Sequence, residues 1–247
     1  MTADRRYGRV ACLVVAGAVL TASCSHDSGA RRSPSATPAV PVAKTARLAP
    51  SGYHGPSALV VPAALVDSAL NLRGAPVAVP LRLEIPTLAV ARPVLAVGIT
   101  ATNIMDAPEG AAQDPAWQAA FWYRGGGIPG AIGTATIAGH VDDSLGRPAL
   151  FAHLDELRIG DAVIVRDLRT GLPMNFVVTA TATYSLDEAS TPEVLARLYG
   201  TGPVDGKGPQ PSADGQSHLT LITCTGGFNY RLGTHDHRLV VFATRAA

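Results

Sequence analysis

The sequence predicts a mainly β fold, either a closed or nearly closed barrel or a sandwich. The first observation is a set of short runs rich in β-branched residues, in which apolar and polar side chains alternate with a period of two. The second is the frequent turn signal between these runs, in a chain with 25 Gly and 19 Pro. The third is the small amount of helical pattern, which leaves about seven or eight strands to enclose one core.

The predicted strands follow one another from residue 77 onward. In the first, 77–86, Leu81, Leu83 and Ile85 alternate with charged residues, which is the pattern of a half-buried strand. The other predicted strands share this short, β-branched character: 91–99, 134–140, 161–167, 175–185, 218–224 and 238–244.

Two segments are predicted to be helical, 114–123 and 190–200. The second has the stronger signal, because Ser190 or Thr191 can act as the N-cap and Pro192 fits the first turn. One or two short helices are therefore expected beside the strands.

The balance of charge indicates no nucleic-acid partner. The 247 residues carry 20 basic and 19 acidic side chains, and 47% of the residues are hydrophobic, which suits one ordinary core. No metal-ligand spacing and no nucleotide motif is present, and the glycines at 125–127 form a turn without a GxxG helix after them. We therefore expect a globular domain with appendages.

The first 24 residues have the pattern of an export signal. Basic residues precede an apolar run, 10–21, that has the length of a signal-peptide core and is too short to span a bilayer well. The run ends on LTASC, which resembles a bacterial lipobox, whose cysteine is acylated and becomes the mature N-terminus. We expect Cys24 to anchor the exported chain, as a lipoprotein, to the outer face of the cytoplasmic membrane. An uncleaved signal helix is the alternative anchor.

A tether is predicted to separate this anchor from the globular domain. Residues 25–76 are rich in Ser, Ala, Pro and Arg, and their first part shows no apolar period. The last part, 57–76, has two apolar stretches divided by Pro62, and whether it packs on the domain or covers a groove stays open. The domain itself is predicted to occupy 77–247.

Cys224 is the one thiol left to the exported domain, because Cys12 lies in the signal and Cys24 is the expected lipid site. A lone thiol outside the cytoplasm favours a reactive role, with a small buried hydrophobe as the alternative. Thiol catalysis also needs an imidazole and a donor for the oxyanion. Among the seven histidines, His140 is the best candidate, since it ends a predicted strand directly after Gly139.

Several motifs resemble those of the sortases, which are cell-wall transpeptidases of Gram-positive bacteria. Residues 220–224, TLITC, look like the TLxTC signature, and residues 138–140 look like the AGH motif. Arg238 stands where the sortase arginine begins the last strand. The likeness covers roughly 78–247, and three further segments are similar to the actinobacterial class F sortases: WYRGGGIPGAIGTATIAGHVDD, LFAHLDELRIGD and TPEVLARLYG.

The resemblance implies a closed eight-stranded β-barrel whose domain is catalytic. It makes Cys224 the nucleophile, which attacks the threonine carbonyl of an LPxTG-like motif to give a thioacyl-enzyme that a cell-wall amine resolves. His140 would be the general acid and base, and Arg238 would donate to the oxyanion. Thr223 is expected to contact the peptide. The implied partners are a sorting-motif peptide and a peptidoglycan-precursor amine; no cofactor is expected, although calcium, which some sortases use, stays open.

Alternatives remain for the arginine and for the function. Class F members carry the arginine slightly earlier, where this chain has Asp236, so Arg231 is the alternative to Arg238. If neither serves the site, the chain would be a sortase-like lipoprotein that binds peptides or assembles with wall proteins. A papain-like peptidase is disfavoured because its cysteine precedes its histidine, and an L,D-transpeptidase because no SHGC-like segment occurs. Asp142 and Asp143 match the acidic position of the class F motif or simply form a turn.

Overall fold

The computed structural model describes residues 71–101, 104–200 and 210–246. The chain divides into the units Met1–Tyr53 and His54–Ala247, and the described residues all lie in the second. The predicted signal, the lipid site Cys24 and the tether as far as residue 70 lie outside the described residues. In the part of the chain that is described, no helix is both long and apolar enough to cross a membrane.

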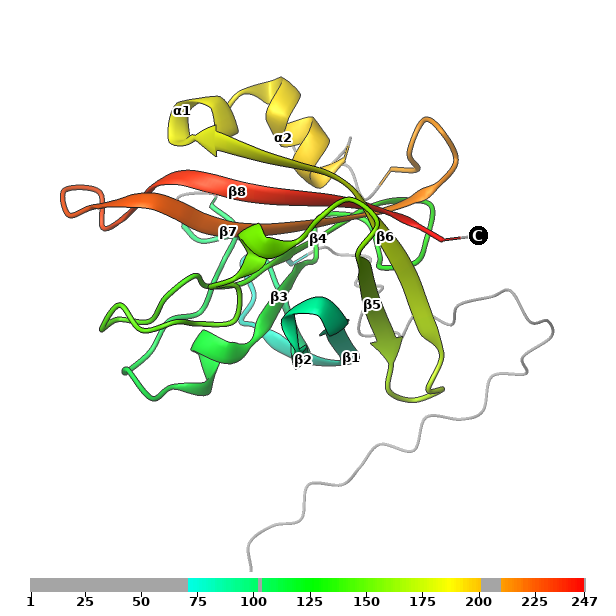
Figure 1. Ribbon diagram of the computed structural model, residues 1–247, viewed down its shortest axis with the longest axis horizontal. Coiled ribbons are helices and arrows are strands. Elements are labelled where there is room, and N and C mark those ends of the chain that lie inside the picture. Colours follow the sequence, from blue (N-terminus) through cyan, green and yellow to red (C-terminus); the bar gives the residue numbers. More distant parts are fainter. Residues whose placement is uncertain (1–70, 102–103, 201–209, 247) are drawn as a thin grey trace, which may run out of the picture. The chain divides into compact units, whose positions relative to one another are not determined.

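Within the described residues, the strands form a closed barrel in the order β1-β2-β3-β4-β7-β8-β6-β5 (Figure 1). The strands are β1 (Val77–Ile85), β2 (Val90–Val97), β3 (Ala120–Tyr123), β4 (Gly133–Ala138), β5 (Ala162–Asp167), β6 (Pro173–Ser185), β7 (Ser217–Asn229) and β8 (Thr234–Arg245). The helices are α1 (Leu186–Ala189) and α2 (Pro192–Tyr199), with 3-10 turns at Pro86–Leu88, Pro115–Gln118 and Leu154–Glu156. The predicted closed eight-stranded barrel with short helices is confirmed.

Two strand pairs are parallel, β2 with β3 and β4 with β7. Parallel neighbours need a long crossover connection, and the one from β2 to β3 runs through residues 98–119. Because β3 is antiparallel to β4, with Phe121 opposite Ala138, the start of β3 and the end of β4 lie at the same edge of the barrel. The crossover therefore ends beside the residues that follow β4.

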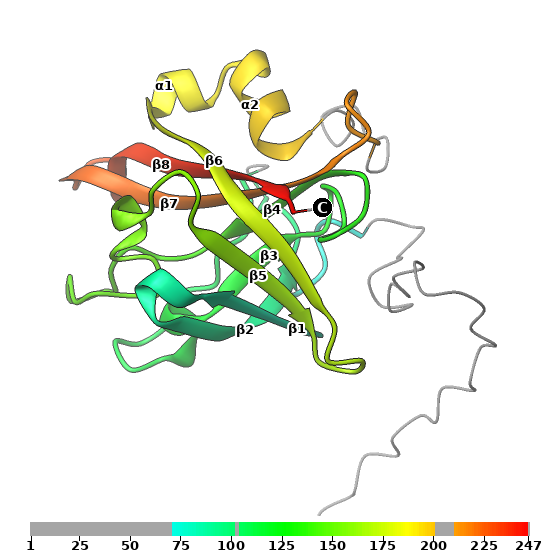
Figure 2. The same cartoon turned by 45° about the vertical axis from the view of Figure 1, so that its right-hand side comes forward.

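The barrel has two packed faces. On β7, Leu219 and Leu221 point into the main core, whereas Ile222 lies on the outer face. There it packs with Val240 of β8 and Leu198 of α2, so α2 covers the outside of the barrel at β7 and β8. Figures 1 and 2 show both helices on this outer side, with β7 and β8 running next to each other beneath them.

The structure corrects the predicted helix at 114–123. Only Pro115–Gln118 is helical, as one 3-10 turn that Asp114 caps, and Ala120–Tyr123 is strand β3. All four residues of β3 are buried, so the segment has no polar alternation that would mark it as a strand. The other predicted helix, 190–200, is confirmed as α2, with Thr191 as its N-cap.

The sequence pattern indicated a strand that ends at Cys224, but the observed strand β7 extends past this residue. β7 continues to Asn229 and pairs with β8 beyond the cysteine, with Phe228 opposite His235. The register shifts between Thr225 and Phe228, where two glycines make a bulge. A side chain at Gly226, whose φ is +81°, would collide with the Asp236 carboxylate, so the bulge needs glycine.

Candidate active site

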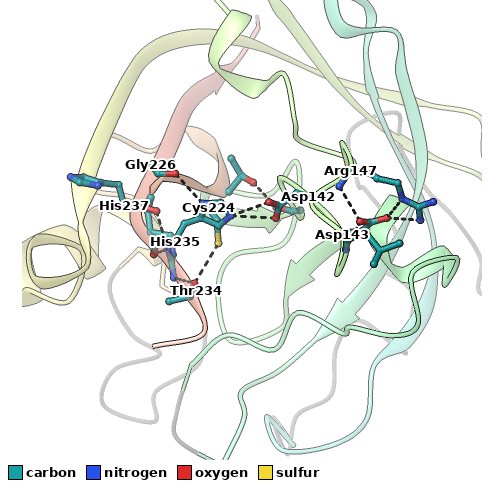
Figure 3. A network of polar contacts seen from close by, with 12 residues as sticks. Asp142, Asp143, Arg147, Cys224, Gly226, Thr234, His235 and His237 are labelled. Atoms are coloured by element: carbon teal, nitrogen blue, oxygen red, sulfur yellow. Dashed lines mark hydrogen bonds and ion pairs between the residues drawn. The ribbon is translucent and has the colours of Figure 1, made fainter. Parts of the chain in front are cut away.

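Cys224 and Arg238 are direct cross-strand partners on β7 and β8. Residues opposite each other in an antiparallel pair place their side chains on the same face, so the thiol and the guanidinium share the outer face of the barrel. Thr234 connects them, because its hydroxyl accepts a hydrogen bond from Arg238 Nη2 at 3.1 Å and lies 3.9 Å from Cys224 Sγ. The hydroxyl hydrogen of Thr234 is then available to the sulfur, a contact that Figure 3 shows.

Arg238 is held by backbone oxygens of its own strand. Its Nη1 donates to the carbonyl oxygens of His235 and His237, at 2.9 and 2.8 Å. A guanidinium has five N–H groups, and within the described residues the contacts to His235, His237 and Thr234 leave the Nε–H and one Nη2–H to donate elsewhere. The side chain therefore has a fixed position and keeps donors for a substrate oxygen.

His140 follows β4 on a backbone fixed from two sides. The Gly139 amide donates to the Ile222 carbonyl at 3.1 Å, and the Phe151 amide donates to the carbonyl of His140 at 2.8 Å. Gly139 has no room for a side chain, because a Cβ there would come within 2.6 Å of the Phe151 ring. The glycine of the AGH motif is thus a packing requirement that seats His140 against the cysteine strand.

The ring of His140 is held by the crossover from β2 to β3. Its Nε2 lies 3.0 Å from the Pro108 carbonyl oxygen, which can only accept, so Nε2 carries the hydrogen. The ring also packs against Trp117 and Phe121, with centroids 4.6 and 5.4 Å away. In the neutral ring this leaves the lone pair on Nδ1 for proton exchange.

These side chains line one groove with a cavity of about 500 Å³. Cys224, His140 and Arg238 all border it, and residues 104–109 of the crossover form one wall. Tyr199, the last residue of α2, also borders it, and burial raises the pKa of this phenol to about 12, although the nearby Arg238 lowers it in part. A groove of this size on the barrel surface can hold an extended peptide segment.

Thr223 has a different environment from its neighbour Cys224. Its side chain is 4% exposed and its hydroxyl donates to the Gly139 carbonyl at 2.8 Å. The bond ties the cysteine strand to the loop that carries His140. Thr223 also borders the groove, and the expected contact with a peptide stays a prediction.

The other predicted site residues lie apart from this group. Arg231 is exposed in the turn between β7 and β8 and does not border the groove, so the structure brings Arg238 and not Arg231 to the cysteine. Asp143 shapes a turn, because it accepts from the Leu145 and Arg147 amides, and the Arg147 guanidinium keeps the pKa of its carboxyl below the usual value. Asp142 pairs instead with His235 (Figure 3).

Thr234 and the Pro108 carbonyl were missed by the sequence reasoning. Thr234 lies before the predicted last strand, and nothing in the sequence indicates that β8 begins at this residue. A backbone carbonyl has no sequence signature. Among the described residues, no group of three or more His, Cys, Asp or Glu is arranged to hold a metal ion.

The sortase domain family model matches residues 83–246. The chain therefore belongs to the sortase family, a family of cysteine transpeptidases, as the motifs predicted. The finer likeness to class F sortases stays a prediction. No curated protein matches the sequence.

Solved structures with a similar fold are also sortases. Sortase A from Corynebacterium diphtheriae is 22% identical, with a TM-score of 0.43 over 68% of this chain and 61% of that chain. Sortase C-1 from Actinomyces oris is 21% identical, with a TM-score of 0.45 over 75% and 80% of the two chains. The Sortase D5 transpeptidase of Clostridium perfringens is 17% identical, with a TM-score of 0.44 over 68% and 78%. Family membership rests on the match of residues 83–246, because likeness at this level carries no functional detail.

Proposed function

We propose that this sortase is an exported cysteine transpeptidase that cleaves an LPxTG-like sorting motif and transfers the acyl group to a cell-wall amine. The observation that carries the proposal is the cross-strand pairing of Cys224 with Arg238 in a groove that His140 also borders. A thiol, an imidazole and a fixed guanidinium on one surface are the groups that acyl transfer requires.

The first half of the reaction forms a thioester. The thiol of Cys224 gives its proton to His140, and its sulfur attacks the carbonyl carbon of the motif's threonine. Arg238 donates hydrogen bonds to the oxygen as negative charge develops on it. The C–N bond then breaks, and His140 delivers a proton to the departing amine. A permanently charged guanidinium suits this oxyanion because it cannot lose its proton.

The second half consumes the thioester. An amine of a peptidoglycan precursor attacks the same carbonyl carbon, and His140 takes the proton that this amine loses. The C–S bond breaks, Cys224 is regenerated, and a new amide joins the sorted peptide to the wall precursor. Water in place of the amine would give hydrolysis.

The proposed location is the outer face of the cytoplasmic membrane. The support is the signal pattern of residues 1–24 with a lipobox-like end at Cys24. Globomycin, which blocks lipoprotein signal cleavage, is expected to stop maturation of the full chain in the producing cell. A mature chain that retains Met1–Ser23 would contradict lipidation.

The function is tested by turnover of a panel of LPxTG-like peptides with an added acceptor amine, followed by mass spectrometry of the products. Wild-type chain is expected to yield the ligated peptide, whereas Cys224→Ala yields none. A folded wild-type protein that processes no peptide in the panel would contradict the proposal and favour a peptide-binding lipoprotein.

A further inference from the structure

His235 contacts all three segments that carry the proposed catalytic residues. Its Nε2 lies 3.2 and 3.3 Å from the two carboxylate oxygens of Asp142, and its Nδ1 lies 3.1 Å from the Gly226 carbonyl (Figure 3). Its own carbonyl accepts the 2.9 Å hydrogen bond from Arg238 Nη1. One residue is thus bound to the loop after β4, the bulge of β7 and the arginine of β8.

The sequence positions show why this matters for geometry. Asp142 is two residues after His140, and Gly226 is two residues after Cys224. The side chain of His235 therefore connects the Asp142 carboxylate, close to the proposed acid and base, with the Gly226 carbonyl, close to the proposed nucleophile.

Both ring nitrogens of His235 face acceptors. A carbonyl and a carboxylate cannot donate, so only the doubly protonated imidazolium satisfies both contacts. The His235 side chain is 14% exposed and that of Asp142 is 35% exposed, which shields the pair in part from water. The ring also meets Phe228 edge to face, at 5.3 Å between centroids.

The other groups around the ring do not replace these contacts. β7 contributes only the Gly226 carbonyl and the uncharged Phe228. On β8, the Arg238 guanidinium binds the His235 carbonyl, and Asp236 is paired with His237 at 2.7 Å. Asp142 is the carboxylate that the ring contacts.

We propose that His235 is a positioning residue of the active site and that Asp142 is its partner. The Asp142–His235–Gly226 clasp fixes the relative placement of His140, Cys224 and Arg238. This role rests on the proposed function, because it presumes that those three residues act on substrate. His235 is outside the main barrel core, so loss of the clasp should loosen the site without unfolding the barrel.

The test uses Asp142→Asn, His235→Gln and the double variant, each made in the chain from residue 54 to 247. The kcat for a sorting peptide is expected to fall about tenfold or more in each single variant, because each variant loses one charge-assisted hydrogen bond. The KM is expected to stay within about twofold of the wild-type value. The double variant should be no slower than the worse single variant, because both break the same clasp.

A matched control is the pair of Asp214 with His218, 2.9 Å apart, near the start of β7 and remote from Cys224. Asp214→Asn is expected to leave kcat within about twofold, as a surface ion pair would.

Amide hydrogen exchange tests the clasp without relying on activity. Exchange in 139–148 and 225–229 is expected to be faster in Asp142→Asn than in wild type, with the Tm nearly unchanged. Unchanged exchange in both segments, or a kcat of Asp142→Asn equal to that of the wild type, would overturn the proposal. An inactive wild type would instead contradict the proposed function, and the exchange result would still decide the clasp.

Discussion

The hydroxyl of Thr223 donates to the carbonyl oxygen of Gly139 at 2.8 Å, across the parallel pair of β7 and β4. Thr223 precedes Cys224 and Gly139 precedes His140, so this buried bond joins β7 to the residue after β4, next to the proposed nucleophile and the proposed acid and base. The threonine of the TLITC motif thereby adds a side-chain bond to the backbone bond between the Gly139 amide and the Ile222 carbonyl.

Replacing Thr223 with valine should slow the enzyme. Valine has nearly the same shape but cannot donate, so the buried Gly139 carbonyl loses its partner at a cost of about 1–3 kcal/mol. We expect a lower Tm and a lower kcat, measured by thermal unfolding and by peptide turnover. Thr223→Ser keeps the hydroxyl and should restore most of both. Equal losses in the valine and serine variants would rule out the hydrogen bond as the cause.

An alanine at Gly139 should destabilise the domain. Its Cβ would lie 2.6 Å from the Phe151 ring, which is 1% exposed and has little room to move. Overpacking of this kind costs about 1–3 kcal/mol, and the Tm should fall by roughly 2–4 °C for each kcal/mol. Gly139→Ala should therefore lower the Tm less when it is added to Phe151→Leu than when it is added to the wild type. Strictly additive effects would argue against the clash.

The choice between the two arginines can be tested directly. Arg238→Lys keeps the charge but loses the planar fork that binds Thr234 and two carbonyls. We expect its kcat to fall by about 10²–10³, the usual cost of one oxyanion donor. Arg231→Ala, in the exposed turn, should change kcat by less than about twofold. The opposite ranking in steady-state turnover would make Arg231 the functional residue.

The raised pKa of Tyr199 predicts that the folded domain loses stability at alkaline pH. Burial raises its pKa from 10.0 to about 12, so between these values the unfolded chain releases a proton that the folded domain retains. Stability that is present below about pH 10 is therefore lost as the pH rises towards 12, on the order of 2–3 kcal/mol for this group. Urea unfolding at pH 9 and 11 should show a smaller fall in Tyr199→Phe. An equal fall in both proteins would exclude Tyr199.

The sequence predicted most strands because half-buried strands alternate. Strand β3 was not predicted because its four residues are all buried and show no alternation. They also follow a Pro-containing turn, so the sequence pattern favoured a helix. The full length of β7 was not predicted because Gly226 and Gly227 are typical of a turn. In the structure, pairing with β8 continues the strand past both glycines. Tertiary pairing decides both cases.

The motifs located Cys224, His140 and Arg238, but they did not define how each is held. Successive side chains of a strand point to opposite faces, so Thr223 and Cys224 lie on opposite faces of β7. The Thr223 hydroxyl is therefore directed to the Gly139 carbonyl and not to the face that carries the thiol. The contacts of His140 with Pro108 and of His235 with Asp142 join residues 32 and 93 positions apart, so only the closed barrel reveals them.

The central claim is that Cys224 becomes acylated by a sorting peptide. The most direct measurement is the intact mass of the domain, from residue 54 to 247, after incubation with the LPxTG-like panel and no acceptor amine. We predict a mass gain equal to the acyl part of one peptide in the wild type, removed by hydroxylamine and absent from Cys224→Ala. A folded wild type with a free Cys224 thiol and no adduct, or an adduct that persists in Cys224→Ala, would contradict the account.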